Sequence, residues 1–375
     1  MKIKNFKKNI VLVLSLIFVI SQISACKQET KDPELVELPK GEVFTLEEDA
    51  PVKDAYTSIS YKLPKEDDNE NVIFYTGQDG KAYYSYQENA DMSNDVKKAE
   101  IGFLEHEKDI PQTLVSSDDE DKSVFYEELN LLDNQLIYLT NFGDKYQLEN
   151  LPAGGGNVEE IASLEKPASL TIIDGLIYFY DIKDDNISIK SIDPKTKEEK
   201  EIADNVHLIT PYDDVSWSDK DHTAWFEDNN DEIYLVYKDN NKMKKIKMDT
   251  DAVTSLAYHG DYLTWMELPD KTSWINEKVH VFNIKENEHK VLELPEASNY
   301  INVKEKIYLC VTQTEDKNQN ATVYEWDLAS NEISAIHDIQ NAQNISSFPK
   351  VYRDGNILIN YEKDDNFIAD FLSSK

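Results

Sequence analysis

The chain has 375 residues, of which 40% are hydrophobic, and it carries a formal net charge of −34. This apolar content is enough for a folded core, either in one large all-β domain or in two or three smaller domains. A nucleic-acid-binding protein needs a basic surface that displaces phosphate counterions, so the acidity argues against nucleic acid as a partner. It argues equally against electrostatic docking on anionic lipid.

The first 25 residues have the pattern of a secretory signal peptide. Four lysines precede an apolar run from Ile10 to Ile20, which only Ser15 interrupts. Such a run is too short to cross a bilayer as a helix, which needs about 20 apolar residues, but it fits the hydrophobic region of a cleaved signal. We therefore predict that residues 1–25 direct export and are then removed.

The signal ends in Ile23-Ser24-Ala25-Cys26, in which an aliphatic residue and two small residues precede a cysteine. This tetrapeptide resembles the lipobox of bacterial lipoproteins. The resemblance implies cleavage after Ala25 and attachment of lipid to Cys26. We therefore expect an extracytoplasmic lipoprotein whose lipid chains anchor it to the bacterial cell membrane without spanning it. The alternative is an ordinary signal peptide followed by a coincidental cysteine.

The lipidated Cys26 and a flexible tether are expected to occupy residues 26–41, which contain two prolines and several charges but little hydrophobic periodicity. Residues 42–375 are then expected to form a single domain. Its one cysteine, Cys310, lies in an apolar run, which predicts a buried and inert thiol. No intramolecular disulfide is expected.

Residues 169–203 have the pattern of four antiparallel strands. Two apolar runs, 169–173 and 176–180, are separated by Asp174-Gly175, a dipeptide that favours a two-residue type I′ turn. A third run, 187–192, alternates apolar and polar residues with the period of two that is typical of a strand. A polar turn and a charged fourth run complete the unit.

Much of the chain repeats this unit, and its second run is the easiest marker. The seven markers are Asn71–Tyr75, Gln135–Leu139, Leu176–Tyr180, Thr223–Phe226, Tyr262–Met266, Lys306–Cys310 and Asn356–Asn360. After the first marker, the spacing is about 40 to 50 residues. Four-stranded repeats of this length are typical of β-propellers.

The repeats also resemble those of TolB-like bacterial β-propellers, over most of the chain after residue 55. That resemblance implies the architecture and transfers no catalytic residue. Seven markers predict an all-β propeller of about seven four-stranded blades, with six or eight as alternatives. The last unit has three strands at most, and we expect Glu42–Glu47 to complete it, since an open sheet edge invites aggregation.

The sequence shows no recognisable catalytic set and no cofactor site. The seven histidines are not paired at the spacing of zinc ligands. Gly154-Gly155-Gly156 has no following helix, which a phosphate-binding loop requires. We therefore predict no catalytic residue and no cofactor.

One segment has metal-ligand character. Asp228, Asn230 and Glu232 alternate as at the start of a calcium loop, although the glycine and the distant glutamate of such a loop are missing. These three residues are the candidate metal ligands.

Acidic pairs also recur between the second and third runs of several units, and equivalent turns of a propeller lie on one face. This predicts a possible acidic docking face for a cation or a basic protein surface, because carboxylates attract positive charge. The alternative is that hairpin tips favour Asp and Asn for conformational reasons alone. The residues are Asp184, Asp185, Asp228, Asp231, Asp364 and Asp365.

Together these features predict a monomeric cell-envelope protein that binds or scaffolds a protein or glycan partner without catalysis. An enzyme that cleaves surface polysaccharide or peptide is the first alternative, because the fold alone does not decide activity. An accessory or sensing subunit of a membrane complex is the second.

Overall fold

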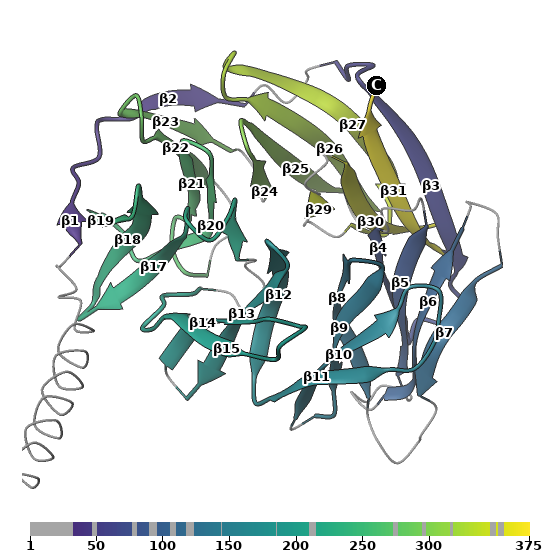
Figure 1. Cartoon of the computed structure of the whole chain (residues 1–375). Helices are drawn as coiled ribbons and strands as arrows, with labels where there is room; N and C mark the ends of the chain where they lie inside the picture. Colours follow the sequence, from purple (N-terminus) through teal and green to yellow (C-terminus); the bar gives the residue numbers. More distant parts are fainter. Residues whose placement is uncertain are drawn as a thin grey trace, which may run out of the picture. The chain divides into compact units, whose positions relative to one another are not determined.

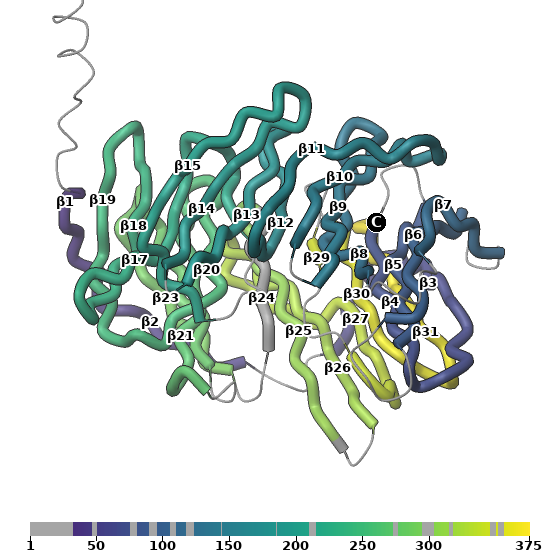
Figure 2. The backbone as a smooth tube through the Cα atoms, turned by 90° about the horizontal axis from the view of Figure 1, so that it is seen from below, coloured from purple at the N-terminus to yellow at the C-terminus, as the bar shows by residue number. Residues whose placement is uncertain are grey.

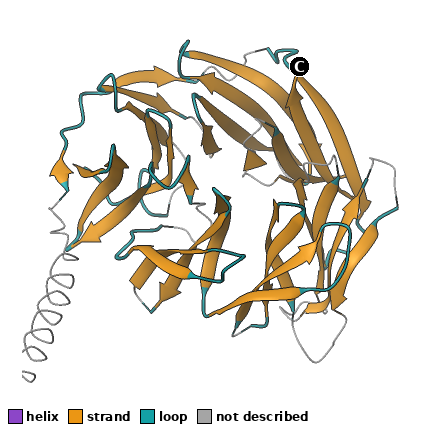
Figure 3. Ribbon diagram, in the orientation of Figure 1, coloured by secondary structure: helices purple, strands orange, loops and turns teal. Residues whose placement is uncertain are grey.

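The computed structural model of the chain describes residues 33–46, 51–76, 81–89, 96–105, 110–117, 124–143, 145–184, 186–209, 215–272, 277–294, 298–315, 318–345, 350–351 and 356–375. Every regular element among these residues is a β-strand (Figure 3). Residues 35–375 form one compact unit. The described chain holds no helix that is both long and apolar enough to cross a bilayer.

The described strands form seven sheets, and most of these sheets have four strands (Figure 1). The first three sheets each contain four consecutive strands of the chain. They are β4 (Glu70–Thr76), β5 (Ala82–Asn89), β6 (Val96–Leu104) and β7 (Gln112–Ser117); β8 (Phe125–Leu132), β9 (Gln135–Asn141), β10 (Tyr146–Pro152) and β11 (Glu159–Leu164); and β12 (Pro167–Ile173), β13 (Leu176–Lys183), β14 (Asn186–Ile192) and β15 (Glu199–Ala203).

The other four sheets include strands from distant parts of the chain. In spatial order they are β17 (Ala224–Asn229), β18 (Glu232–Asp239), β19 (Lys242–Lys247) and β1 (Glu34–Leu35); β16 (Ser216–Trp217), β20 (Val253–His259), β21 (Tyr262–Glu267), β22 (Lys278–Asn283), β23 (Glu288–Glu293) and β2 (Glu42–Thr45); β24 (Ser298–Val303), β25 (Lys306–Glu315), β26 (Asn318–Asp327) and β27 (Glu332–Ala342); and β28 (Asn344–Ile345), β30 (Ile357–Lys363), β31 (Asn366–Ser374) and β3 (Tyr56–Pro64). The short strand β29 (Lys350–Val351) pairs with β30 as well.

Seven clusters of buried apolar side chains lie between neighbouring sheets. Phe179 of β13, for example, packs in one cluster with Leu139 of β9. Another cluster contains Tyr61 of β3 and Phe74 of β4, so it joins the seventh sheet to the first. The sheets therefore close into a ring, held by burial of side chains that each contribute about 1.5–3 kcal/mol.

The hairpin turns follow the predicted chemistry. Asp174 and Gly175 have φ angles of 52° and 78°, and this left-handed conformation at both positions defines a type I′ turn. The turn places Ile173 opposite Leu176 and fixes the register of β12 and β13. Consecutive antiparallel strands turn at alternate ends of each sheet, so the hairpins gather at two faces of the unit (Figure 2).

Two of the seven sequence markers are wrong in their position within the repeat. Asn71–Tyr75 lies in β4, and most of Thr223–Phe226 lies in β17, and both strands are first in their sheets rather than second. The second case has a structural cause. The preceding strand, β16, pairs in parallel with β20 of the next sheet, where the Trp217 side chain is buried. As a result, β17 is the first strand of the fourth sheet.

The ring is also closed by a different segment from the one expected. Strand β3 pairs with β31 along nine residue pairs, from Tyr56 opposite Ser374 to Pro64 opposite Asn366. The expected closing strand was Glu42–Glu47; its residues Glu42–Thr45 instead form β2, which pairs in parallel with β23 in the fifth sheet, and Glu47 lies outside the described residues. A nine-pair antiparallel ladder provides more backbone hydrogen bonds than a four-residue segment can, which explains the choice.

The predicted boundary between tether and domain, at residue 42, needs correction as well. The partly buried side chains of Val36 and Leu38 pack against the cluster between the fourth and fifth sheets. The backbone N–H of Val36 donates to the carbonyl of Lys245, 2.8 Å away. Residues 36–41 are therefore packed chain rather than tether.

Candidate functional site

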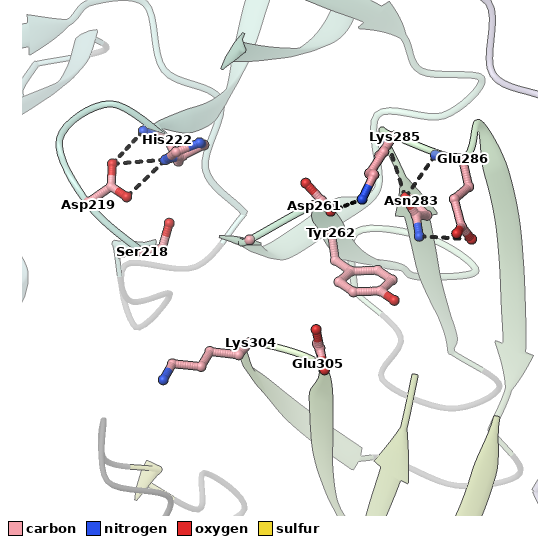
Figure 4. A pocket seen from close by; sticks show the side chains of 11 residues that line it. Ser218, Asp219, His222, Asp261, Tyr262, Asn283, Lys285, Glu286, Lys304 and Glu305 are labelled. Atoms are coloured by element: carbon pink, nitrogen blue, oxygen red, sulfur yellow. Dashed lines mark hydrogen bonds and ion pairs between the residues drawn. The ribbon is translucent and has the colours of Figure 1, made fainter. Parts of the chain in front are cut away.

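A pocket of about 540 Å³ lies on the face where first strands turn into second strands (Figure 4). Its wall comes from three neighbouring sheets. The loop 218–222 contributes from before β17, the turns 260–261 and 283–286 from the fifth sheet, and the turn 304–305 from the sixth. Polar and charged side chains dominate this wall.

Tyr262 lies near the middle of the pocket (Figure 4). It is the first residue of β21, directly after the Gly260-Asp261 turn, in which Gly260 adopts a φ of 58°. It is paired with Asn283 of β22, and directly opposite residues in an antiparallel pair project on the same side of the sheet. The aromatic ring and the side-chain amide are therefore presented together, and the ring is only partly buried.

Carboxylates surround the Tyr262 hydroxyl. Burial raises the pKa of Tyr262 above its ordinary value, and the negative charges of Glu305, Glu286 and Asp261 raise this pKa further. Asp261 has a distant ion pair with Lys285, with Nζ and Oδ2 3.9 Å apart. The pocket thus offers hydrogen-bond acceptors from several directions around one aromatic ring.

A histidine–aspartate pair lies at another side of the pocket. Nδ1 of His222 is 2.8 Å from Oδ2 of Asp219 and 3.0 Å from Oδ1, and the ring lies edge-on to Tyr258. Burial acts to raise the pKa of Asp219, but the hydrogen bond from His222 and two backbone N–H donors outweigh it, and the pKa is lowered. The aspartate thus orients the imidazole.

The adjacent Ser218 does not complete a nucleophilic triad. Its hydroxyl is buried and has no hydrogen-bond partner, so it is not bonded to His222. A serine nucleophile requires that bond, because the imidazole must accept the hydroxyl proton. The described residues therefore do not show an assembled acyl-transfer site here.

A second cavity, of about 270 Å³, adjoins the first. Tyr262, Asn283 and Glu286 line both cavities. The second cavity extends along β22 and β23 to the β26–β27 turn at Leu328 and Ala329. The two hollows therefore lie along the boundary between the fifth and sixth sheets.

No protein-family model matches the chain, and no curated protein matches it. Solved structures do match. The β-propeller domain of the Trilobed protease from Pyrococcus furiosus has a TM-score of 0.53 at 10% identity, covering 84% of this chain and 95% of that one. An oligogalacturonate lyase in complex with manganese has a TM-score of 0.51 at 11% identity, covering 87% and 99%. TolB from Acinetobacter baumannii has a TM-score of 0.41 at 12% identity, covering 73% and 81%.

This chain is a β-propeller. The prediction of an all-β propeller made mostly of four-stranded sheets is confirmed, and the resemblance to TolB and other bacterial propellers is structural. At identities this low the likeness establishes the fold alone. Since propellers serve both as binding proteins and as enzymes, the function has to be argued from the pocket.

Four of the six acidic residues predicted as a docking face occupy tight turns of the propeller, and Asp228 lies in β17. Asp184, Asp231, Asp364 and Asp365 all have φ angles between 52° and 67°, in the left-handed region that Asp and Asn tolerate. Asp185 lies outside the described residues. None of these residues lines the Tyr262 pocket. Their conformation supports the turn explanation, and the docking face stays a prediction.

The candidate metal ligands form a similar turn. Oδ1 of Asp228 accepts the backbone N–H of Asp231, and Asn230 has a φ of 55°. The Glu232 carboxylate is engaged by Lys247, at 2.5 Å, and by the Tyr234 hydroxyl, at 2.7 Å, and the Lys247 hydrogen bond lowers its pKa. No group of three or more His, Cys, Asp or Glu side chains suited to a metal ion occurs in the described part of the chain.

The two cysteines differ in what the structure says of them. Cys26, the predicted lipid attachment site, lies outside the described residues. Cys310 is fully buried in β25, and burial raises the pKa of its thiol to about 12. The prediction of an inert core thiol agrees with this environment, because nucleophilic cysteines need a lowered pKa.

The sequence does not predict the Tyr262 pocket, because Tyr262 occurs there only as the first residue of the strand marker Tyr262–Met266. The one available signal was that Tyr262 directly follows a turn, where a side chain can reach the rim of a sheet.

Proposed function

We propose that this protein is a lipid-anchored, extracytoplasmic β-propeller that binds a carbohydrate, without catalysis, in the pocket around Tyr262. The lipobox and signal pattern support the location, and the pocket supports the ligand class. The acidic docking face is a separate proposal for a protein partner, and no contact between its residues strengthens it.

The observation that carries the proposal is a partly exposed aromatic ring encircled by side chains that accept and donate hydrogen bonds. Sugars present apolar C–H faces that stack on an aromatic ring, and hydroxyls that bond to carboxylates and amides. Asn283 supplies an amide beside the Tyr262 ring, while Asp261, Glu286 and Glu305 supply acceptors. A pocket of about 540 Å³ has the size of ordinary small-ligand sites.

The test is saccharide binding to the protein without its first 26 residues, which retains the compact unit 35–375. Titration calorimetry against cell-envelope glycan fragments is expected to show saturable binding that Tyr262→Ala weakens by about tenfold or more, since an aromatic platform contributes roughly 1–3 kcal/mol. Tyr234→Ala is the matched control, because Tyr234 is a surface tyrosine that lines neither cavity. Equal affinity of the wild type and Tyr262→Ala would refute the pocket assignment.

The Asp219–His222 pair favours a second candidate, an enzyme acting on a surface polysaccharide. An oriented imidazole at the side of a sugar-sized pocket is a usable general base. Turnover of a bound glycan that His222→Gln abolishes, without a loss of binding, would establish this function in place of the first. Binding without turnover supports the non-catalytic proposal.

A further inference from the structure

The two cavities form one groove rather than two separate sites. Tyr262, Asn283 and Glu286 belong to both, so a ligand passing over Tyr262 contacts both cavities at once. The inner end of the groove lies at Ser218 and His222. Its outer end lies at the β26–β27 turn. This shape suits a chain of sugar units better than a single sugar.

Acidic side chains outnumber lysines along the groove. Five carboxylates line the two cavities, against three lysines. Three of the carboxylates act together on the Tyr262 hydroxyl, namely those of Asp261, Glu286 and Glu305. Tyr262 and Glu286 line both cavities, so these carboxylates lie near the place where the two cavities meet.

The net charge of the whole chain adds to the excess of negative charge in the groove. The whole chain carries a formal charge of −34, so the long-range potential repels polyanions and attracts cations. Inside a concave site, water is partly excluded and each charge acts more strongly than on an open surface. An acidic polysaccharide is for this reason a poor ligand, and a neutral one gains hydrogen bonds but no charge attraction from the carboxylates.

We propose that the groove binds a cationic oligosaccharide, a chain of several sugar units with a free amino group on the unit that stacks on Tyr262. The proposal rests on the carbohydrate-binding function argued above and adds the charge and the length of the ligand. The ammonium group lies among the Asp261, Glu286 and Glu305 carboxylates, and the following units occupy the second cavity.

The charge is tested with three probes of equal length: a glucosamine tetramer, its fully N-acetylated counterpart and a galacturonate tetramer. In mildly acidic buffer of low ionic strength, the glucosamine tetramer is expected to bind about tenfold more tightly than the acetylated form. The galacturonate tetramer is expected not to bind. Added salt should reduce the difference, because it screens partly exposed charges.

Single substitutions identify the residues that cause the preference for the free amine over the acetylated form. Glu286→Gln and Glu305→Gln are each expected to reduce the preference for the free amine over the acetylated tetramer by about threefold to tenfold, because the amide keeps a hydrogen-bond acceptor but loses the negative charge. Glu201→Gln is the control, because Glu201 is an exposed acid on β15 that lines neither cavity.

The length is tested by blocking the second cavity. Ala329 lies in an exposed turn, so Ala329→Phe can fill the outer cavity without disturbing a core. This variant is expected to bind the tetramer no better than it binds the dimer. Ser330→Phe, which places the same ring beside the cavity at a residue that does not line it, is expected to behave as the wild type.

The outcomes separate this inference from the function on which it rests. If the acetylated tetramer binds as tightly as the amine, and the glutamine variants change neither affinity, the cationic ligand is refuted while carbohydrate binding stands. If no saccharide binds and Tyr262→Ala matches the wild type, both are refuted.

Discussion

Nδ1 of His280 lies 3.0 Å from Nε2 of His289, so two buried histidine rings share a hydrogen bond beside the N-terminal segment. The other nitrogen of His289, Nδ1, lies 3.0 Å from the carbonyl oxygen of Pro39. A carbonyl only accepts, so Nδ1 of His289 carries a proton and Nε2 of the neutral ring accepts from His280. Both rings stack on Trp265.

A carboxylate and a lysine lie at the other end of this histidine pair. Nε2 of His280 lies 3.3 Å from Glu267, whose second carboxylate oxygen pairs with Lys278 at 3.0 Å. The hydrogen bond with His280 lowers the pKa of Glu267 to about 2. Protonation of His289 would place a proton on Nε2 and remove the acceptor of the hydrogen bond from His280, so the contact between the two rings requires a neutral His289.

The first prediction is that packing of the N-terminal segment weakens in mild acid. Burial lowers the pKa of His289 below its ordinary value of 6.5. Below 6.5 the unfolded state therefore binds more protons than the folded state, and the free energy of unfolding falls as the pH falls towards the folded pKa. Backbone amide hydrogen exchange in residues 36–45 should become faster as the pH falls through this range.

The variant His289→Asn should flatten the pH dependence of the free energy of unfolding, whereas the control His207→Asn should not. An unchanged slope in His289→Asn would falsify the assignment.

The second prediction concerns Gly41, which passes close to the same histidine. A Cβ atom at Gly41 would lie 2.7 Å from Cγ2 of Val291 and 3.1 Å from Nδ1 of His289. Gly41→Ala is therefore expected to displace β2 and to cost about 1–3 kcal/mol through overpacking. Urea denaturation measures the loss. Gly154→Ala is the control, because no atom lies within 4 Å of its added Cβ, and equal stability of the two variants would contradict the prediction.

The third prediction tests the closing strand β3. Asp370 on β31 is buried, and it accepts hydrogen bonds from Ser60 of β3, from Tyr361 at 3.0 Å and from His337 at 3.0 Å. Burial acts to raise the pKa of Asp370, but the bonds from His337 and Ser60 outweigh it and lower the pKa. Its stabilising effect is therefore present above its ordinary pKa of 3.8 and is lost as the pH falls below that value.

Ser60→Ala is accordingly expected to cost about 1 kcal/mol, and Asp370→Ala about 2–4 kcal/mol because it leaves three partly buried donors without an acceptor. The exposed Ser58→Ala on the same strand is expected to change stability by less than about 0.5 kcal/mol. The free energy of unfolding in urea checks all three. A loss in Ser58→Ala equal to that in Ser60→Ala would show that the hydroxyl bond is irrelevant.

The fold could be predicted from the repeat because the sequence of each unit specifies its own strands and turns. Asp174-Gly175 and the runs beside it specify a hairpin locally, and recurrence of that pattern specifies a ring. The errors arose where distant segments compete for one edge. β3 and β2 are both short alternating runs in sequence, and only the number of pairs each can make decides which one closes the ring.

The candidate site could not be predicted in the same way. Tyr262, Glu305 and His222 come from three sheets, and each occupies an unremarkable turn or strand start in the sequence. They meet only because neighbouring sheets pack through their apolar clusters and bring turns at the same end of the strands together. The acidic turns, by contrast, are recognisable in the sequence because their residues are adjacent in the chain, and conformational preference alone explains that clustering.

The fourth prediction separates charge from conformation at those turns. Asp364 and Asp365 have φ angles of 52° and 56°, which Asn tolerates and β-branched residues do not. Asp364→Asn and Asp365→Asn are expected to leave stability unchanged within about 0.5 kcal/mol, and Asp365→Val to cost about 1–2 kcal/mol. Thermal unfolding measures both effects. Loss of stability in the Asn variants would mean that the charge matters, and would favour the acidic-face proposal.

The fifth prediction addresses the membrane anchor. If the lipobox Ile23-Ser24-Ala25-Cys26 directs lipidation, the protein partitions into the membrane fraction through lipid chains on Cys26. Cys26→Ser is expected to move the exported protein into the soluble fraction, whereas Cys310→Ser, which alters a buried thiol, leaves it in the membrane fraction. Detergent phase separation, with mass spectrometry of the N-terminal peptide, measures the shift. Retention of Cys26→Ser in the detergent phase would rule out lipid on this cysteine as the anchor.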